Sequence, residues 1–276
     1  MKKVRISKNG GNKTLNTILV FPYYMILFSL ILVPIFIMVV SSFLRGDSNN
    51  LFQVSLTFEN YLNFFGNEDY LYAMGRSIWL ALLTTISTLL IGYPLAYFIT
   101  KTKTRTQALL ILLISAPMWI NLVIRTIALK QIIELIIPSI LKTNTAMVFG
   151  LTHVFLPFMV LPIYTILLKI DSNLIEAAND LGASKFVAFL KVILPLSLPG
   201  VMSGILMVFL PAATTLVIPK YLGNNVFLIG DIIERVSILS GNIGYGAAIA
   251  IILSIIMMAM MLVVKRVDKF KGEEYE

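Results

Sequence analysis

The stretch EAANDLGASKFVAFLKVILPLSLPG, residues 176–200, interrupts a chain that is otherwise strongly apolar. Asn173 and Glu176, three residues apart, have the spacing of a helix capping box, which predicts a first short helix from Leu174 to Leu181. Gly182 then stands where a helix usually ends in a left-handed residue. Ser184 can cap the start of a second helix. The stretch therefore predicts a helix, a glycine turn and a second helix that enters an apolar segment.

The composition of the chain is that of a membrane protein. Of its 276 residues, 58% are hydrophobic and 13% are charged, whereas soluble domains are about one quarter charged. The sequence has no cysteine and one histidine, which excludes disulfides, thiolate metal sites and multi-histidine metal sites within the chain. In such a protein the net charge of +8 indicates basic cytoplasmic loops and not nucleic-acid binding.

Six segments are long and apolar enough to cross a bilayer, which takes about 20 residues. The first follows a basic N-terminus, residues 1–16, and is expected to remain as an uncleaved span because it exceeds a signal-peptide core and lacks a small-x-small cleavage site. The sequence therefore predicts an all-α membrane protein with both termini on one side. The expected spans are 17–43, 77–100, 108–128, 145–170, 196–216 and 244–264.

The distribution of Lys and Arg predicts the orientation of these spans. One set of segments carries 14 of the 22 cations, and the opposite set carries six in more residues. The positive-inside rule places the first set in the cytoplasm, and with it both termini. This cytoplasmic set comprises 1–16, 101–107, 171–195 and 265–276.

The opening stretch is thus expected on the cytoplasmic membrane surface, where two interpretations remain open. Ala177 and Ala178 give the short helix a smooth face against which another backbone can lie, as in a docking element tied to a membrane span. An amphipathic helix that contacts only lipid headgroups would have a similar pattern.

The same stretch resembles the EAA loop of ABC importer permeases, whose pattern is E-A-A-x3-G-x9-I-x-L-P. Six of the seven positions match, and Val192 stands where isoleucine is usual. The resemblance implies a six-span type I importer permease whose cytoplasmic loop 171–195 is the coupling helix region docked on a separate ATPase. The matching residues are Glu176, Ala177, Ala178, Gly182, Leu194 and Pro195.

From about Phe21 to Val264 the chain also resembles the spermidine/putrescine permease subfamily, and most the first of its two permease subunits. This likeness rests on LTFENY (56–61), IGYPLAYFITK (91–101), IRTIALK (124–130), LPFMVLPIY (156–164) and FLIGDIIERV (227–236). It implies a multi-pass subunit in a bacterial cell membrane that imports polyamines with a sister permease, a cytoplasmic ATPase dimer and an extracytoplasmic substrate-binding protein. Permeases for iron, sulfate, molybdate or other small solutes share much of this frame.

A polyamine pathway would need acids and aromatic faces, yet the predicted spans contain no Asp or Glu. Arg125 and His153 lie where polar groups are costly, and each is either a gate or a structural group. The external segment 219–241 contains an apolar periodic stretch that could dock the binding protein. The candidate pathway or gate residues are Arg125, His153, Tyr164, Asp231 and Glu234.

The chain lacks a G-x-x-x-x-G-K-[ST] phosphate loop, so it is expected to bind no cofactor itself and to leave ATP to its partner. An integral membrane enzyme is a remote alternative because the spans offer no catalytic pair. An anchor or receptor without transport activity is a third, and stimulation of a partner ATPase would distinguish it.

Overall fold

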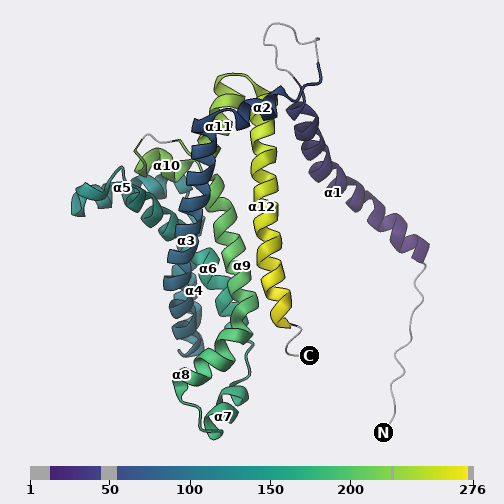
Figure 1. Ribbon diagram of the computed structural model, residues 1–276. Coiled ribbons are helices and arrows are strands. Elements are labelled where there is room, and N and C mark those ends of the chain that lie inside the picture. Colours follow the sequence, from purple (N-terminus) through teal and green to yellow (C-terminus); the bar gives the residue numbers. More distant parts are fainter. Residues whose placement is uncertain (1–12, 45–54, 225–226, 273–276) are drawn as a thin grey trace.

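Residues 13–44, 55–224 and 227–272 are described by the structure, a computed structural model, and they form helices joined by short turns (Figure 1). The longer helices are α1 (Lys13–Ser42), α3 (Glu68–Thr100), α4 (Thr104–Ser115), α5 (Leu122–Ile136), α6 (Asn144–Leu167), α9 (Leu194–Thr214) and α12 (Ile243–Gly272). The shorter ones are α2 (Glu59–Phe65), α7 (Ser172–Asp180), α8 (Lys185–Ala188), α10 (Val217–Leu222) and α11 (Ile229–Glu234). Two 3-10 turns, η1 (Ala116–Trp119) and η2 (Pro138–Ile140), and two π-helical turns, η3 (Phe189–Ile193) and η4 (Arg235–Leu239), complete the elements.

Five helices in the described residues have the length and hydropathy to cross a membrane, and each overlaps a span expected from the sequence. Helix α3 is longer than its expected span: its 33 residues reach about 50 Å at 1.5 Å per residue, against roughly 30 Å of hydrocarbon. The five segments are Pro22–Ser42, Glu68–Thr100, Asn144–Leu167, Lys185–Thr214 and Ile243–Val264.

The third expected span, 108–128, is not one helix in the structure. It is divided between α4 with η1 and α5, which meet at 103°, so a sixth span exists only if this bent pair crosses as one unit. Pro117 lies in the 3-10 turn, where its missing N–H weakens the helix. Asn121 then starts a new helix, because its side chain accepts a hydrogen bond from the Val123 amide at 2.9 Å. Hydropathy records apolar length and not these breaks.

Helices α3, α6 and α9 pack closely through glycines. Gly200 and Gly204, four residues apart, face α6: a Cβ at Gly200 would lie 2.9 Å from the Pro162 carbonyl oxygen, and one at Gly204 would lie 2.6 Å from the Met159 sulfur. Small residues at this spacing let membrane helices approach to backbone contact. The interior of the bundle is therefore held by close backbone packing.

Helix α1 leaves this bundle at an angle (Figure 1). Its C-terminal end is held by Asn60 of α2, whose amide donates to the carbonyls of Ser42 and Leu44 at 2.9 and 3.0 Å. That end also contacts Gly244, where a side chain would meet the Leu44 carbonyl. The large side chains along Tyr23–Val40 are mostly exposed, as suits a helix surrounded by lipid or by another membrane subunit.

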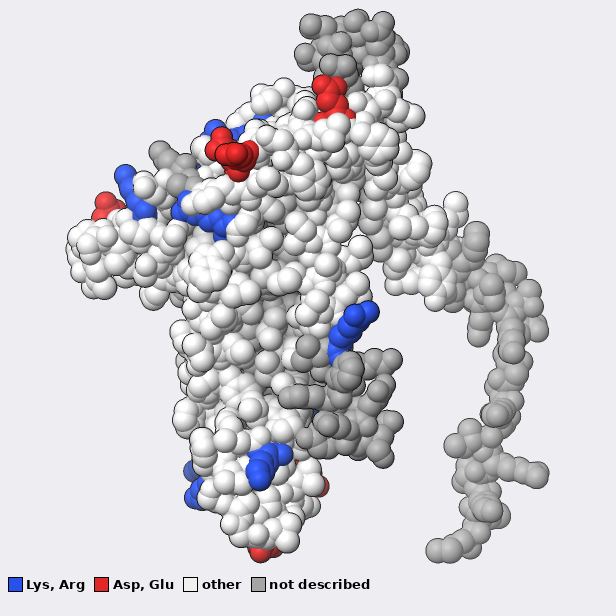
Figure 2. All heavy atoms as spheres, in the orientation of Figure 1, with Lys and Arg blue, Asp and Glu red and all other residues white. Residues whose placement is uncertain are grey.

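The short helices gather at the two ends of the bundle. Helices α7 and α8 lie at one end, and α2 and α11 lie at the other (Figure 1). On the face in Figure 2, charged side chains gather toward these ends and leave much of the middle uncharged. Helix α11 is fastened to α3, because the Ile229 amide donates to the buried Ser77 hydroxyl at 2.8 Å.

Candidate functional site

The EAA-like loop begins with α7, whose N-cap is Asp171. The Asp171 carboxylate accepts a hydrogen bond from the Asn173 amide at 3.0 Å. The expected capping box of Asn173 and Glu176 is therefore wrong, and the helix starts two residues earlier than that box required. An aspartate is as good a cap as an asparagine, so the local pattern alone did not distinguish the two positions.

The turn after α7 is a Schellman motif centred on Gly182. Gly182 has φ +83°, its amide donates to the Asn179 carbonyl at 2.9 Å, and the Ala183 amide donates to the Ala178 carbonyl at 3.0 Å. These two bonds satisfy the last carbonyls of the helix. The predicted left-handed residue at Gly182 is thus confirmed.

The loop presents an open surface beyond the spans. Glu176 and Ala177 are exposed, Ala178 is half-buried, and Leu181 is 89% exposed at the tip. Helix α7 packs against α8 and the π-turn η3. An exposed leucine on a rigid helical turn is a feature that another protein surface can cover.

Helix α8 continues into α9 through η3 and forms one helical run, Lys185–Thr214. The predicted boundary between loop 171–195 and span 196–216 lies within this run. The π-turn ends just before it, and the Leu194 amide donates to the carbonyl of Phe189, five residues earlier. Pro195 has no amide to donate, so the wider turn precedes it. Movement of the loop would act directly on α9.

Phe189 in the π-turn also ties the loop to α3. Its ring makes edge contacts with Tyr93 and Tyr97, at centroid distances of 5.9 and 5.3 Å. The Tyr93 hydroxyl shares a buried hydrogen bond of 2.8 Å with the hydroxyl of Ser197 on α9. Sequence reasoning missed this contact. The i, i+4 spacing of the tyrosines marks one helix face, but nothing in the sequence names Phe189 as their partner.

Arg125 lies just after the break between α4 and α5. Its guanidinium donates to the Pro117 carbonyl at 2.6 Å and to the Val154 carbonyl at 3.2 Å. Arg125 therefore joins the broken segment to α6, and the structure favours the structural interpretation of this residue. His153 is exposed on α6, close enough for the charge of Arg125 to act on it.

The remaining pathway candidates lie elsewhere. The Tyr164 hydroxyl donates a long hydrogen bond of 3.4 Å to the Gln107 side chain, between α6 and α4. Asp231 is buried in the first turn of α11 and accepts a hydrogen bond from the Leu228 amide at 3.1 Å. Burial raises the pKa of Asp231 above its ordinary value, and the hydrogen bond from Leu228 opposes the rise. Glu234, half-buried, ends the same helix. The five candidates therefore do not form a single site.

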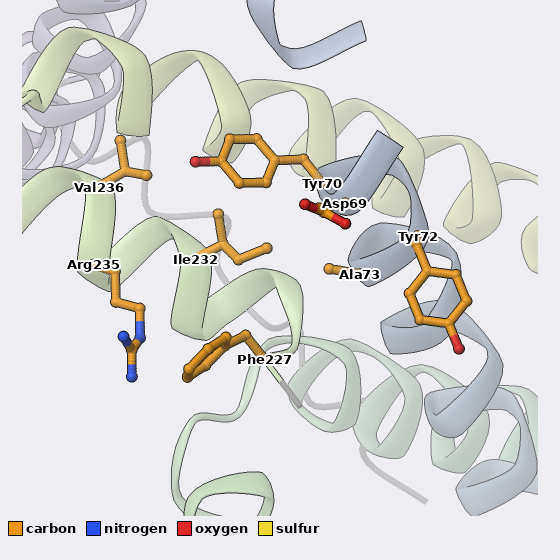
Figure 3. A pocket seen from close by; sticks show the side chains of 8 residues that line it. All are labelled: Asp69, Tyr70, Tyr72, Ala73, Phe227, Ile232, Arg235 and Val236. Atoms are coloured by element: carbon orange, nitrogen blue, oxygen red, sulfur yellow. The ribbon is translucent and has the colours of Figure 1, made fainter. Parts of the chain in front are cut away.

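A cavity of about 420 Å³ lies at the end of the molecule opposite α7 (Figures 1 and 3). Its two sides come from the first turns of α3 and from the segment through α11 and η4. The Arg235 guanidinium lies over the Phe227 ring, 3.7 Å from its centroid. Sequence reasoning missed this cavity because its two sides are about 160 residues apart in the chain. The lining residues are Asp69, Tyr70, Tyr72, Ala73, Phe227, Ile232, Arg235 and Val236.

Comparison with solved structures defines the class of the fold. A chain of the bacterial ABC transporter that imports the acidic polysaccharide alginate superposes with a TM-score of 0.73 at 14% identity, covering 92% of this chain and 96% of that chain. A chain of the MetNI methionine ABC transporter superposes with a TM-score of 0.59 at 19% identity, covering 74% and 99%. The fold is that of the transmembrane subunits of ABC importers.

Sequence comparison gives the family. Residues 11–271 match the family described as binding-protein-dependent transport system inner membrane component, and the chain belongs to this family. The spermidine/putrescine transport system permease protein PotB of Haemophilus influenzae is 36% identical over 262 residues, 89% of this chain and 91% of the relative. PotB of Escherichia coli is 32% identical over 262 residues, 89% and 95%.

The chain is accordingly a multi-pass permease subunit of an ABC importer in a bacterial inner membrane. Such a subunit is not itself an enzyme. The family implies that a cytoplasmic ATPase and a substrate-binding protein work with it.

Proposed function

We propose that this chain is a permease subunit of a polyamine importer, with spermidine and putrescine as substrates. The observation that carries the proposal is the 36% identity to a spermidine/putrescine permease across nine-tenths of both chains. The alginate and methionine transporter chains described above come from transporters of other solutes and are below 20% identical, so they support the fold and not a substrate.

The loop around α7 docks on the ATPase. The basic side of the permease, which includes both termini, faces the cytoplasm. ATP is bound by the two ATPase subunits and not by this chain. The rigid turn at Gly182 holds α7 at a fixed angle to α8, and the exposed Leu181 is available for the partner surface. The docking residues are Glu176, Ala177, Ala178 and Gly182, with Leu194 and Pro195 at the entry into α9.

Motion of the docked loop reaches the spans by two routes, one a continuous helix and the other a ring contact. The unbroken helical run from α8 into α9 carries the motion of the loop into that helix. Phe189, seated on Tyr93 and Tyr97, carries it into α3. When the ATPase subunits close, α3 and α9 would therefore move together and open the path outward.

The pathway itself lies between this chain and a sister permease, because the acids of the segment Glu68–Thr100 stand at its first turn and the apolar runs predicted from the sequence contain no Asp or Glu to bind a polyamine. Weak binding suits this role, since the separate binding protein supplies the affinity. Arg125 keeps the broken segment in place beside α6.

The proposal is tested by uptake of labelled spermidine and putrescine in cells that lack this chain. Uptake is compared with and without the restored chain, at equal expression of the partner proteins and in a strain without another polyamine importer. Uptake that depends on the chain is the expected result. Unchanged polyamine uptake would reject the substrate and direct the assay to other small solutes.

A further inference from the structure

The cavity between α3 and η4 already contains a cation of the chain's own. The Arg235 side chain is exposed and its guanidinium lies 3.7 Å from the centre of the Phe227 ring. This distance is well within the 6 Å at which an aromatic ring attracts a cation. Phe227 is 40% exposed, so a soluble cation can reach the same ring if Arg235 moves away.

The opposite side of the cavity supplies negative charge and further aromatic surface. Asp69 is exposed in the first turn of α3. Tyr70 is half-buried and packs against Tyr245, with ring centroids 5.8 Å apart, so that its ring is held in place. In Figure 3, Asp69 and Tyr70 lie on one side of the cavity and Phe227 and Arg235 lie on the other, with the Tyr70 hydroxyl directed toward Val236. An ammonium group between the two sides would meet both a carboxylate and a ring face.

The surrounding charge favours a cation once Arg235 has left. Glu68 and Asp69 belong to the first turn of α3, and Asp231 and Glu234 belong to α11. Against these four acids stand Arg235 and Lys220, both close enough to act on Asp231. The volume of about 420 Å³ lies in the range of small-molecule sites.

We propose that this cavity is a receiving site for a primary ammonium group of the transported amine, where Asp69 and Phe227 hold the cation and Arg235 occupies the ring in its absence. The inference rests on the proposed function. Aliphatic amines with pKa values near that of lysine are charged at neutral pH, so each end of a polyamine carries the required group. The cavity lies at the end opposite the docking loop, on the side from which a binding protein would deliver substrate.

The test uses the complete importer in proteoliposomes, with saturating polyamine-loaded binding protein, and measures uptake and ATP hydrolysis together. Phe227→Leu and Asp69→Asn are expected to lower polyamine imported per ATP by about three- to tenfold, the range of one cation–π or ion contact. ATP hydrolysis should stay near wild type, because α7 is untouched. Phe65→Leu on α2 and Glu134→Gln on α5 are matched controls that change an exposed ring and an exposed acid outside the cavity.

Arg235→Gln provides a change in the opposite direction. Removing the resident cation frees the Phe227 ring, so uptake per ATP at limiting loaded binding protein should rise. In the double variant with Phe227→Leu this gain should disappear, because the ring that Arg235 occupied is gone.

Three results would overturn the inference. If the ratio of uptake to hydrolysis is unchanged in both cavity variants, the cavity does not receive substrate. If uptake and stimulated hydrolysis fall together, the surface docks the binding protein instead. If the wild-type importer carries no polyamine at all, the proposed function fails and this inference with it.

Discussion

Gly182 allows the docking role of the loop to be tested by a graded series of substitutions. Its φ of +83° is the reason for glycine at this position, since a Cβ there would meet no atom within 4 Å. An L-residue in the left-handed region costs about 1–2 kcal/mol, which lowers the equilibrium constant for the native turn by about fivefold to thirtyfold. Asparagine adopts this region more easily than alanine. Proline cannot adopt it, and it also removes the amide that donates to the Asn179 carbonyl at 2.9 Å.

The expected order of uptake is therefore Gly182 wild type, then Gly182→Asn, then Gly182→Ala, with Gly182→Pro nearly inactive. The alanine variant should lower uptake by no more than the fall in the equilibrium constant for the native turn, which is about thirtyfold at most. Uptake and ATP hydrolysis are measured in the same proteoliposomes, and the amount of inserted chain is measured in each. Since the turn lies outside the spans, all three variants should insert normally.

Two outcomes would refute this reasoning. Normal transport by Gly182→Pro would mean that the angle between α7 and α8 does not matter. Equal losses in the asparagine and alanine variants would mean that the left-handed backbone is not the cause. A bulky residue at Ala177 supplies an independent check: this side chain is exposed in the isolated chain, so a loss of coupled transport would report contact with the ATPase.

Other contacts make further predictions. Gly200→Leu should destabilise the detergent-purified chain by about 1–3 kcal/mol or more in thermal unfolding, since its Cβ would lie 2.9 Å from the backbone of α6. The control Gly75→Ala, with no atom within 4 Å of the new Cβ, should be neutral or slightly stabilising. An equal loss of stability in the two variants would contradict the packing argument. Tyr93→Phe removes the buried hydrogen bond to Ser197 on α9 and should cost about 0.5–1.5 kcal/mol and lower uptake per ATP. An unchanged ratio would exclude this hydrogen bond from coupling and leave only the ring contacts with Phe189. Arg125→Lys should lower the melting temperature, because lysine cannot reproduce the two-pronged link to Pro117 and Val154; an unchanged temperature would contradict the structural role. Burial raises the pKa of Asp231 above its ordinary 3.8, so ionisation of this carboxyl costs stability as the pH rises above that value. Asp231→Asn should therefore be at least as stable as wild type at pH 7, and the difference should vanish below about pH 4. The reverse trend in a pH series of melting curves would refute this prediction.

The sequence was sufficient wherever a short pattern has one physical solution. Gly182 after a polar helical segment predicted a left-handed turn, and φ +83° confirms it. The long apolar runs predicted a polytopic helical protein, because lipid admits few other ways to satisfy a spanning backbone. The EAA-like stretch indicated the family, which the match over residues 11–271 confirms.

Patterns with several solutions were not resolved by the sequence. Asp171 and Asn173 are equivalent caps by residue type, and only the path of the backbone selected Asp171. The apolar run 108–128 satisfied the length rule for a span, yet Pro117 and Asn121 divide it into helices at 103°. Hydropathy averages over such a run and does not weigh the backbone groups that a proline leaves unpaired.

The sequence by itself thus determined the class of the protein, the apolar segments and the glycine turn of the docking loop, because each depends on composition or on neighbours within a few residues. Only the tertiary structure decided which distant side chains meet. Phe189 contacts Tyr93 and Tyr97, Arg125 donates to the carbonyl of Val154, and Asp69 and Phe227 line the same cavity. These neighbours depend on how helices far apart in the chain pack against one another. The physical reason is that side-chain volume and backbone geometry at the interface fix how closely two helices approach. No local sequence pattern encodes that approach.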